Sequence, residues 1–217
     1  NATGAFMQGL DATYIYSEGA LIDTNGFDVT IAQALLAPTG NGVSSIPVVS
    51  GGTGYLAEPI VRITGDGVGA TARAVVDGSG TITGIVITNP GTGYTTASAT
   101  LLGGGGSGGS VGMVALSANA SGGLTKQGNG TLTLTGANTF SGDTRVVAGT
   151  LAVNNAQALG QSTLDMNAAD AGAVTFNQAS TLGGLKGSRN LAGGNNDLTV
   201  GANNTTFFVH KFRSMRT

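Results

Sequence analysis

The order of apolar and polar residues along the chain predicts short β-strands. Alternating runs occur at 59–63, 81–87, 131–135 and 149–153, and clusters of Gly, Asn and Asp separate them. A period of two places successive side chains on opposite faces of a strand. The side chains expected to face a core are Leu132, Leu134, Val147, Leu151 and Val153, and those expected to face water are Thr131, Thr133 and Thr135.

Strands this short cannot bury an apolar face alone. Stacked about 4.8 Å apart, they share backbone hydrogen bonds and build one continuous core, which is the physical basis of a solenoid. The N-terminal part follows the same pattern, with runs at 12–16, 20–23 and 28–32 and an Asn25-Gly26 turn. We therefore expect an all-β chain built as a solenoid.

A tandem repeat occupies residues 46–116. The segment 46–55 aligns with 85–94 at an offset of 39 residues, and both copies end in Gly-Thr-Gly-Tyr. Turn signals such as Asp77-Gly78 separate the strands within it. The spacing allows two interpretations, an inserted β domain or extra rungs of the solenoid.

The chain is thus expected to have four parts. They are N-terminal solenoid rungs at 1–45, the tandem Gly-rich repeat at 46–116, a second solenoid region at 117–206 and an atypical tail at 207–217. The tail contains three of the seven Phe residues and the single His. We interpret it as an unstructured end, a capping strand or a reading-frame artefact in preference to a functional basic segment.

The amino-acid composition limits the classes of molecule that are expected to bind the chain. Gly accounts for 39 of 217 residues, and only 9% of residues are charged, against roughly a quarter in ordinary globular chains. A net charge of -2 without a basic stripe makes nucleic acid an unlikely partner. Without Cys, packing and backbone ladders must hold the fold.

Nothing in the sequence predicts insertion into a membrane. No stretch approaches eighteen consecutive apolar residues, and the sequence starts at Asn1 without a basic-then-apolar leader. Either a signal has been removed, or the sequence is an internal fragment.

Residues 122–153 resemble the autotransporter-associated β-strand repeat, whose usual form is GGLTK-x-G-x-GTLTLTGANTY-x-G-x-T-x-V-x-x-GTL. The sequence has Phe140 where Tyr is common. The resemblance implies a right-handed parallel β-helix that is exported and displayed at, or released from, the bacterial surface, usually ahead of a C-terminal translocator barrel. The roughly sixty residues after the repeat are too few for such a barrel. We expect a piece, a barrel-less relative or a subunit exported by other means.

Candidate catalytic residues are few, and we expect no catalytic site. His210 lies in the atypical tail, where no spacing ties it to a Ser for nucleophilic catalysis. Glu18 and Glu58 would act as a glycosidase acid and base only if the fold brought them together, and Asp165 is a further carboxylate to test. Exposed turn carboxylates are the better interpretation.

Candidate binding motifs are also weak, so we expect no metal and no cofactor. The segment 23–28 resembles a calcium loop without its final Glu, and 193–198 resembles a single incomplete calcium-binding nonapeptide. The Gly-rich segment 103–110 lacks the Lys-Ser/Thr of a phosphate loop. One short Thr ladder at 131–135 is too little for an ice-binding face.

The sequence therefore predicts a secreted, non-catalytic surface protein, either extracellular or associated with the outer membrane. We expect a structural or adhesive display module whose partners are surface glycans or molecules of a host or neighbouring cell. The alternative is a subunit that self-associates into a filament by strand donation or end-to-end stacking, because few charges guard its strand edges. A polysaccharide-active β-helix enzyme is a remote third possibility.

Overall fold

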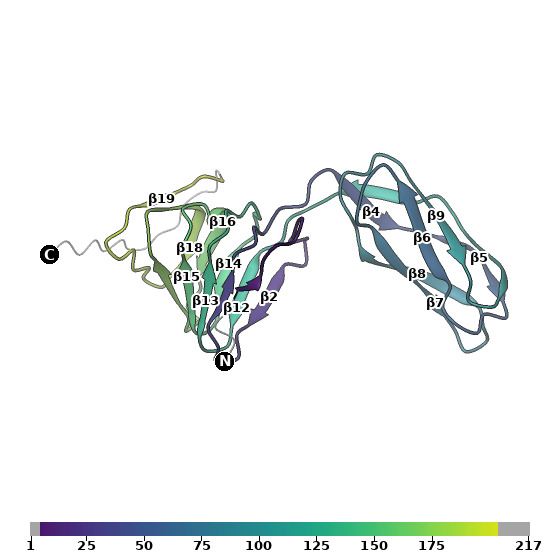
Figure 1. Cartoon of the computed structure of the whole chain (residues 1–217), viewed down its shortest axis with the longest axis horizontal. Helices are drawn as coiled ribbons and strands as arrows, with labels where there is room; N and C mark the ends of the chain where they lie inside the picture. Colours follow the sequence, from purple (N-terminus) through teal and green to yellow (C-terminus); the bar gives the residue numbers. More distant parts are fainter. Residues whose placement is uncertain (1–4, 204–217) are drawn as a thin grey trace. The chain divides into compact units, whose positions relative to one another are not determined.

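The structure is a computed structural model that describes residues 5–203, and within this range it contains strands and turns but no helix. The chain divides into two compact units (Figure 1). Residues 38–119 form one, which we call the inserted unit, and the residues on either side form the other, the solenoid unit. The predicted tail at 207–217 lies outside the described residues.

The solenoid unit consists of two parallel sheets. One has the strand order β1-β3-β13-β15-β17 and the other β19-β18-β16-β14-β12-β2. These strands are β1 (Ala5–Met7), β2 (Ala20–Asp23), β3 (Val29–Ile31), β12 (Leu124–Gln127), β13 (Thr131–Leu134), β14 (Thr144–Val146), β15 (Thr150–Val153), β16 (Leu159–Met166), β17 (Ala173–Phe176), β18 (Ser180–Gly187) and β19 (Leu198–Val200). The predicted all-β parallel solenoid is confirmed.

Successive coils of the solenoid stack in register. Leu124 pairs with Thr144 and Thr144 with Leu164, so one coil at this point is 20 residues long. In the other sheet Leu132 pairs with Leu151, and both are completely buried. The interior is a stack of apolar side chains two residues apart along each strand, as the alternation predicts.

The predicted orientation of Val147 is wrong. Thr144 and Val146 are the buried residues of β14, whereas Val147 is half-buried. The two-residue period ends with the strand at Val146, and the chain then turns through Gly149, which has φ +68°. The predicted strand at 12–16 is also reduced to isolated bridges at Tyr14 and Tyr16.

Neither sheet of the solenoid unit is interrupted by residues 38–119. β2 and β3 precede the inserted unit, and they pair in parallel with β12 and β13, which follow it. The first coil therefore stacks directly on the coil that comes roughly a hundred residues later. The Ala37 N–H donates to the Thr139 hydroxyl at 3.0 Å, which fixes the chain where it leaves the solenoid.

The inserted unit is antiparallel. Its four-stranded sheet has the order β8-β7-β6-β9, and β5 pairs with β10 and β4 with β11. These strands are β4 (Asn41–Ser45), β5 (Val48–Thr53), β6 (Ile60–Gly65), β7 (Thr71–Val76), β8 (Ile82–Asn89), β9 (Ala97–Leu102), β10 (Ser107–Val111) and β11 (Ala115–Ala118). Of the two interpretations of the tandem repeat, the structure matches a separate β unit with its own core.

The two copies of the 39-residue repeat exchange equivalent contacts. The Tyr55 ring lies against Gly104 and Gly106, and the Tyr94 ring lies against Gly65 and Gly67, which are the same positions of the other copy. A Cβ on any of these glycines would approach the facing ring too closely. The glycines are therefore required for close packing, and both tyrosines are buried.

Strand pairing follows the same exchange. β6 and β9 occupy equivalent places in the two copies, and they pair with each other. The pair Ala72 and Ile87 corresponds, at the offset of 39, to Val111 and Val48. Each copy thus supplies strands that complete the other, so we expect the tandem repeat to unfold as one cooperative unit.

We predict that Tyr55→Ala and Tyr94→Ala destabilise the inserted unit to a similar extent. Each substitution removes a buried ring at an equivalent position, which costs about 3 to 5 kcal/mol for large aromatic side chains. Hydrogen exchange followed by mass spectrometry should show loss of protection across 38–119 and retained protection in β12 to β18. Loss of protection confined to one copy would contradict the exchange.

Candidate functional site

A buried lysine lies at a corner between two coils of the solenoid. Lys126 is completely buried on β12. Its Nζ donates hydrogen bonds to the carbonyl oxygens of Gln127 at 3.0 Å, Gly128 at 2.6 Å and Ala148 at 3.1 Å. These three acceptors match the three N–H groups of an ammonium. Gln127 ends β12 and Gly128 follows it, whereas Ala148 lies in the corresponding turn of the next coil.

Burial changes the pKa of Lys126 and its access to solvent. Desolvation lowers the pKa of Lys126, and the negative charge of Asp23 partly opposes that change. Gly149 encloses the site, because a Cβ there would lie 2.7 Å from Nζ and 2.6 Å from the Gly128 carbonyl oxygen. Lys126 is thus a buried link between turns, and it is not accessible to a substrate.

A buried asparagine links three coils in a similar way. The Asn138 Oδ1 accepts from the Leu35 N–H, and its Nδ2 donates to the Ala158 carbonyl, both at 2.9 Å. Later coils use the same device, since Asn155 donates to the Thr135 carbonyl and Asn196 to the Phe176 carbonyl. Backbone groups at the corners are satisfied by side chains from neighbouring coils.

Two of these linking residues, Lys126 and Asn138, lie in a segment that is similar to a known repeat. Comparison with protein-family models matches residues 124–153 to the passenger-associated transport repeat. No curated protein and no solved structure matched the chain. The matched segment contains both Lys126 and Asn138, which the alternation of apolar and polar residues does not mark as linking residues.

We predict that Lys126→Met destabilises the passenger repeat by about 2 to 4 kcal/mol, because it leaves buried carbonyl oxygens without donors. Urea unfolding of the solenoid unit measures the change. Thr125→Met is the matched control, since Thr125 precedes Lys126 and is only half-buried, and its effect should stay within about 0.5 kcal/mol. An unfolding midpoint for Lys126→Met at or above that of the wild type would contradict the linking role.

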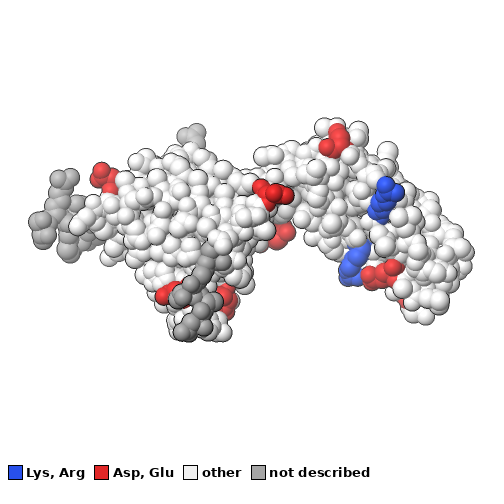
Figure 2. Space-filling view, in the orientation of Figure 1, with Lys and Arg blue, Asp and Glu red and all other residues white. Residues whose placement is uncertain are grey.

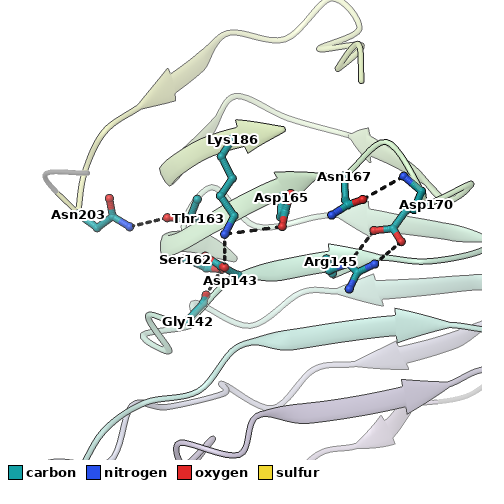
Figure 3. Close-up of polar contacts among 11 residues, drawn as sticks. Gly142, Asp143, Arg145, Ser162, Thr163, Asp165, Asn167, Asp170, Lys186 and Asn203 are labelled. Carbon is teal, nitrogen blue, oxygen red and sulfur yellow. Dashed lines mark hydrogen bonds and ion pairs between the residues drawn. The ribbon is translucent and has the colours of Figure 1, made fainter. Parts of the chain in front are cut away.

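Charged side chains gather on the outer face of the six-stranded sheet (Figure 3). Arg145, Asp165 and Lys186 are in register on β14, β16 and β18. Arg145 donates two hydrogen bonds to Asp170, at 2.8 and 2.7 Å. Lys186 forms ion pairs with Asp143 and, at 3.6 Å, with Asp165. The charges alternate in sign, so they hold neighbouring coils together.

The Asp170 carboxylate is the most buried acid of this cluster. Only 2% of its side chain is exposed, whereas 40% of the Arg145 side chain is exposed. The hydrogen bonds from Arg145 lower the pKa of Asp170, and burial partly opposes them. The same pairing raises the pKa of Arg145. This ion pair is a structural contact between β14 and the turn that precedes β17.

The three carboxylates considered for catalysis lie in different surroundings. Glu58 pairs with Arg73 at 3.1 Å in the inserted unit, and Glu18 accepts a hydrogen bond from the Ser17 hydroxyl in the solenoid unit. Asp165 faces Lys186. Glu18 and Glu58 belong to different compact units, and His210 lies outside the described residues.

The segment compared with a calcium loop forms an Asn-Gly turn. Asn25 and Gly26 both have positive φ, at 45° and 86°, and the Asp23 Oδ1 accepts from the Asn25 N–H at 2.8 Å. Asp28 accepts from the Thr131 N–H at 2.7 Å. Within residues 5–203 no group of three or more His, Asp or Glu side chains is arranged to hold a metal ion.

Both Gly-rich candidate motifs form turns or strands. Residues 103–105 have positive φ and lead into β10, and 193–196 close a turn through a backbone hydrogen bond. None of the described segments is a helix long and apolar enough to cross a membrane.

The predicted Thr ladder continues only partly across the coils. Thr133 pairs with Thr30 on one side and with Ala152 on the other, and Ala152 pairs with Thr175. A row of Thr is therefore interrupted at β15. The face remains free of Lys and Arg at these positions, but it is not a continuous Thr array.

We predict that Asp170→Asn makes the solenoid unit less stable by about 2 kcal/mol at neutral pH. The folded pKa of Asp170 lies below its unfolded value of about 3.9, so its contribution is present above that value and is lost as the pH falls toward the folded pKa. Urea unfolding at pH 7 and pH 3 should show a smaller difference between variant and wild type at pH 3. An equal difference at both pH values would contradict this assignment.

Proposed function

We propose that the chain is part of an exported surface protein, in which the solenoid unit is a stalk that displays the inserted unit. One observation carries the proposal. The coils on either side of residues 38–119 stack on each other, so the inserted unit interrupts neither sheet of the stalk. The passenger-associated transport repeat, found on this solenoid, supports export to the cell surface.

The ends of the inserted unit favour a display role. β4 and β11 are its first and last strands, and they pair with Asn41 opposite Ala118. The chain therefore enters and leaves the unit at adjacent positions. A domain attached in this way is added to a scaffold at little cost to the scaffold's fold.

The surroundings of the acidic residues support a non-catalytic role. Asp143, Asp165 and Asp170 form ion pairs, and Asp23 and Asp28 accept hydrogen bonds from backbone N–H groups. These are structural uses of carboxylates. Adhesion through the inserted unit is the function that this arrangement supports best, at the cell surface or outside the cell.

A filament subunit is the second candidate. It is favoured by exposed apolar side chains on the first coil, where Phe6, Leu21 and Phe27 have 67%, 64% and 50% of their surface exposed. Such side chains suit contact between stacked ends of two copies.

Deletion of 38–119, with a short Gly-Ser linker from Ala37 to Ala120, tests the display proposal. We expect the shortened protein to reach the cell surface, where a protease added to intact cells removes it, and to lose adhesion to other cells. Unchanged adhesion would contradict display by the inserted unit. Filaments of the shortened protein in negative-stain electron microscopy would favour the second candidate.

A further inference from the structure

One guanidinium of the inserted unit has no partner. Arg62 lies on β6 with an exposed side chain, and it is the one Lys or Arg within residues 5–203 that has neither a hydrogen bond nor an ion pair. The other described cations bind carboxylates or carbonyl oxygens. Arg62 is therefore the described cation that is free to bind an external anion.

Hydroxyl groups surround Arg62 on the same sheet face. Thr100 lies directly opposite it on β9. Thr64, two residues along β6, shares a hydrogen bond of 2.8 Å with Ser98, and on the other strands Thr71 shares one of 2.7 Å with Thr88. These side chains are exposed. The face therefore offers hydroxyl donors and acceptors around the unpaired Arg62, and Arg73, which forms an ion pair with Glu58, lies on the neighbouring strand.

A shallow depression lies where β6 ends and β9 begins, on the two strands that carry Arg62 and Thr100. It has a volume of about 260 Å³ and is lined by Thr64, Gly65, Thr96, Ala97 and Ser98. Arg62 and Thr64 are two residues apart on one strand face, which corresponds to roughly 7 Å. The volume is below the roughly 300 to 1,000 Å³ of pockets that enclose a whole small molecule. It suits one unit of a longer polymer that lies across the sheet.

The carboxylates of the inserted unit already have hydrogen-bond or ion-pair partners within the unit. Asp66 accepts hydrogen bonds from Thr95 and Thr96, which lower its pKa. Asp77 accepts hydrogen bonds from Ser79 and Thr81, which lower the pKa of Asp77. Glu58 pairs with Arg73. Both cations of the unit, Arg62 and Arg73, lie on the strands β6 and β7, and Figure 2 shows basic side chains on the face of this unit turned toward the viewer.

We propose that this face of the β9-β6-β7-β8 sheet binds an acidic polysaccharide. Arg62 holds a carboxylate or sulfate group through two parallel N–H donors, and the depression takes the adjoining sugar, whose hydroxyls bond to Thr64 and Ser98. A nucleic acid needs many more cations than one free guanidinium. The inference rests on the proposed display function and names the ligand class of the displayed unit.

Titration calorimetry with the full chain tests this binding directly. The probes are alginate oligosaccharides, which carry one carboxylate per sugar, sulfated dextran, neutral dextran and polyglutamate. We expect binding to at least one of the two acidic polysaccharides, weakening as salt screens the charges, and none to neutral dextran. Arg62→Gln should weaken binding at least tenfold. Arg189→Gln removes the same charge from the solenoid unit and should leave the affinity unchanged.

A second variant tests the depression separately from the charge. Ser98→Gln fills it without changing the net charge, and it should weaken binding to polysaccharide while its circular dichroism remains that of the wild type. The proposal is overturned if Arg62→Gln binds with wild-type affinity, if no acidic polysaccharide binds, or if only polyglutamate binds. The display function is tested separately, by the surface exposure and adhesion of the deletion variant on cells. A protein that binds no acidic polysaccharide would therefore contradict the ligand proposal and not the display function.

Discussion

The parallel pairing of one coil with the next is the interaction on which the rest of the structure depends. No strand in the solenoid unit is longer than eight residues, and several have only three or four. Such strands gain stability only when their backbone groups and their apolar faces are shared with a neighbour. The pairing continues from β2 to β12 although the inserted unit separates them in sequence. The inserted unit therefore leaves the pairing of these coils intact.

Stacked coils bring turn carbonyls and N–H groups together at the corners, where water is largely excluded. Lys126 and Asn138 satisfy these groups from within. Lys126 bonds to its own coil and to the next one, and Asn138 bonds to the coils on either side. A buried ammonium with three carbonyl partners replaces the water that an exposed turn would bind. Within the passenger-associated transport repeat these two polar residues are therefore structural in the same sense as Leu132 and Leu134.

The inserted unit forms its core in a different way from the solenoid unit. Its strands are antiparallel, and its core is completed by exchange between the two copies of the 39-residue repeat. Tyr55 and Tyr94 occupy equivalent positions of the two copies, and each packs on glycines of the other copy. Within the first copy, β6 and β7 pair as neighbouring strands, which puts Arg62 and Arg73 on one exposed sheet face. Charge and hydroxyl groups that are scattered in sequence thus become neighbours.

The sequence by itself determined the local features of this protein. Alternation of Leu and Thr at 131–134 is enough to specify a strand with one buried face, and Asn25-Gly26 is enough to specify a turn, because both depend only on neighbouring residues. The tertiary structure decided the rest. Whether 46–116 joins the solenoid, whether Val146 or Val147 faces the core, and which carbonyls Lys126 binds all depend on contacts between residues distant in sequence. A period in one segment carries no information about its partner strand, and that partner sets register, burial and the position of every polar contact.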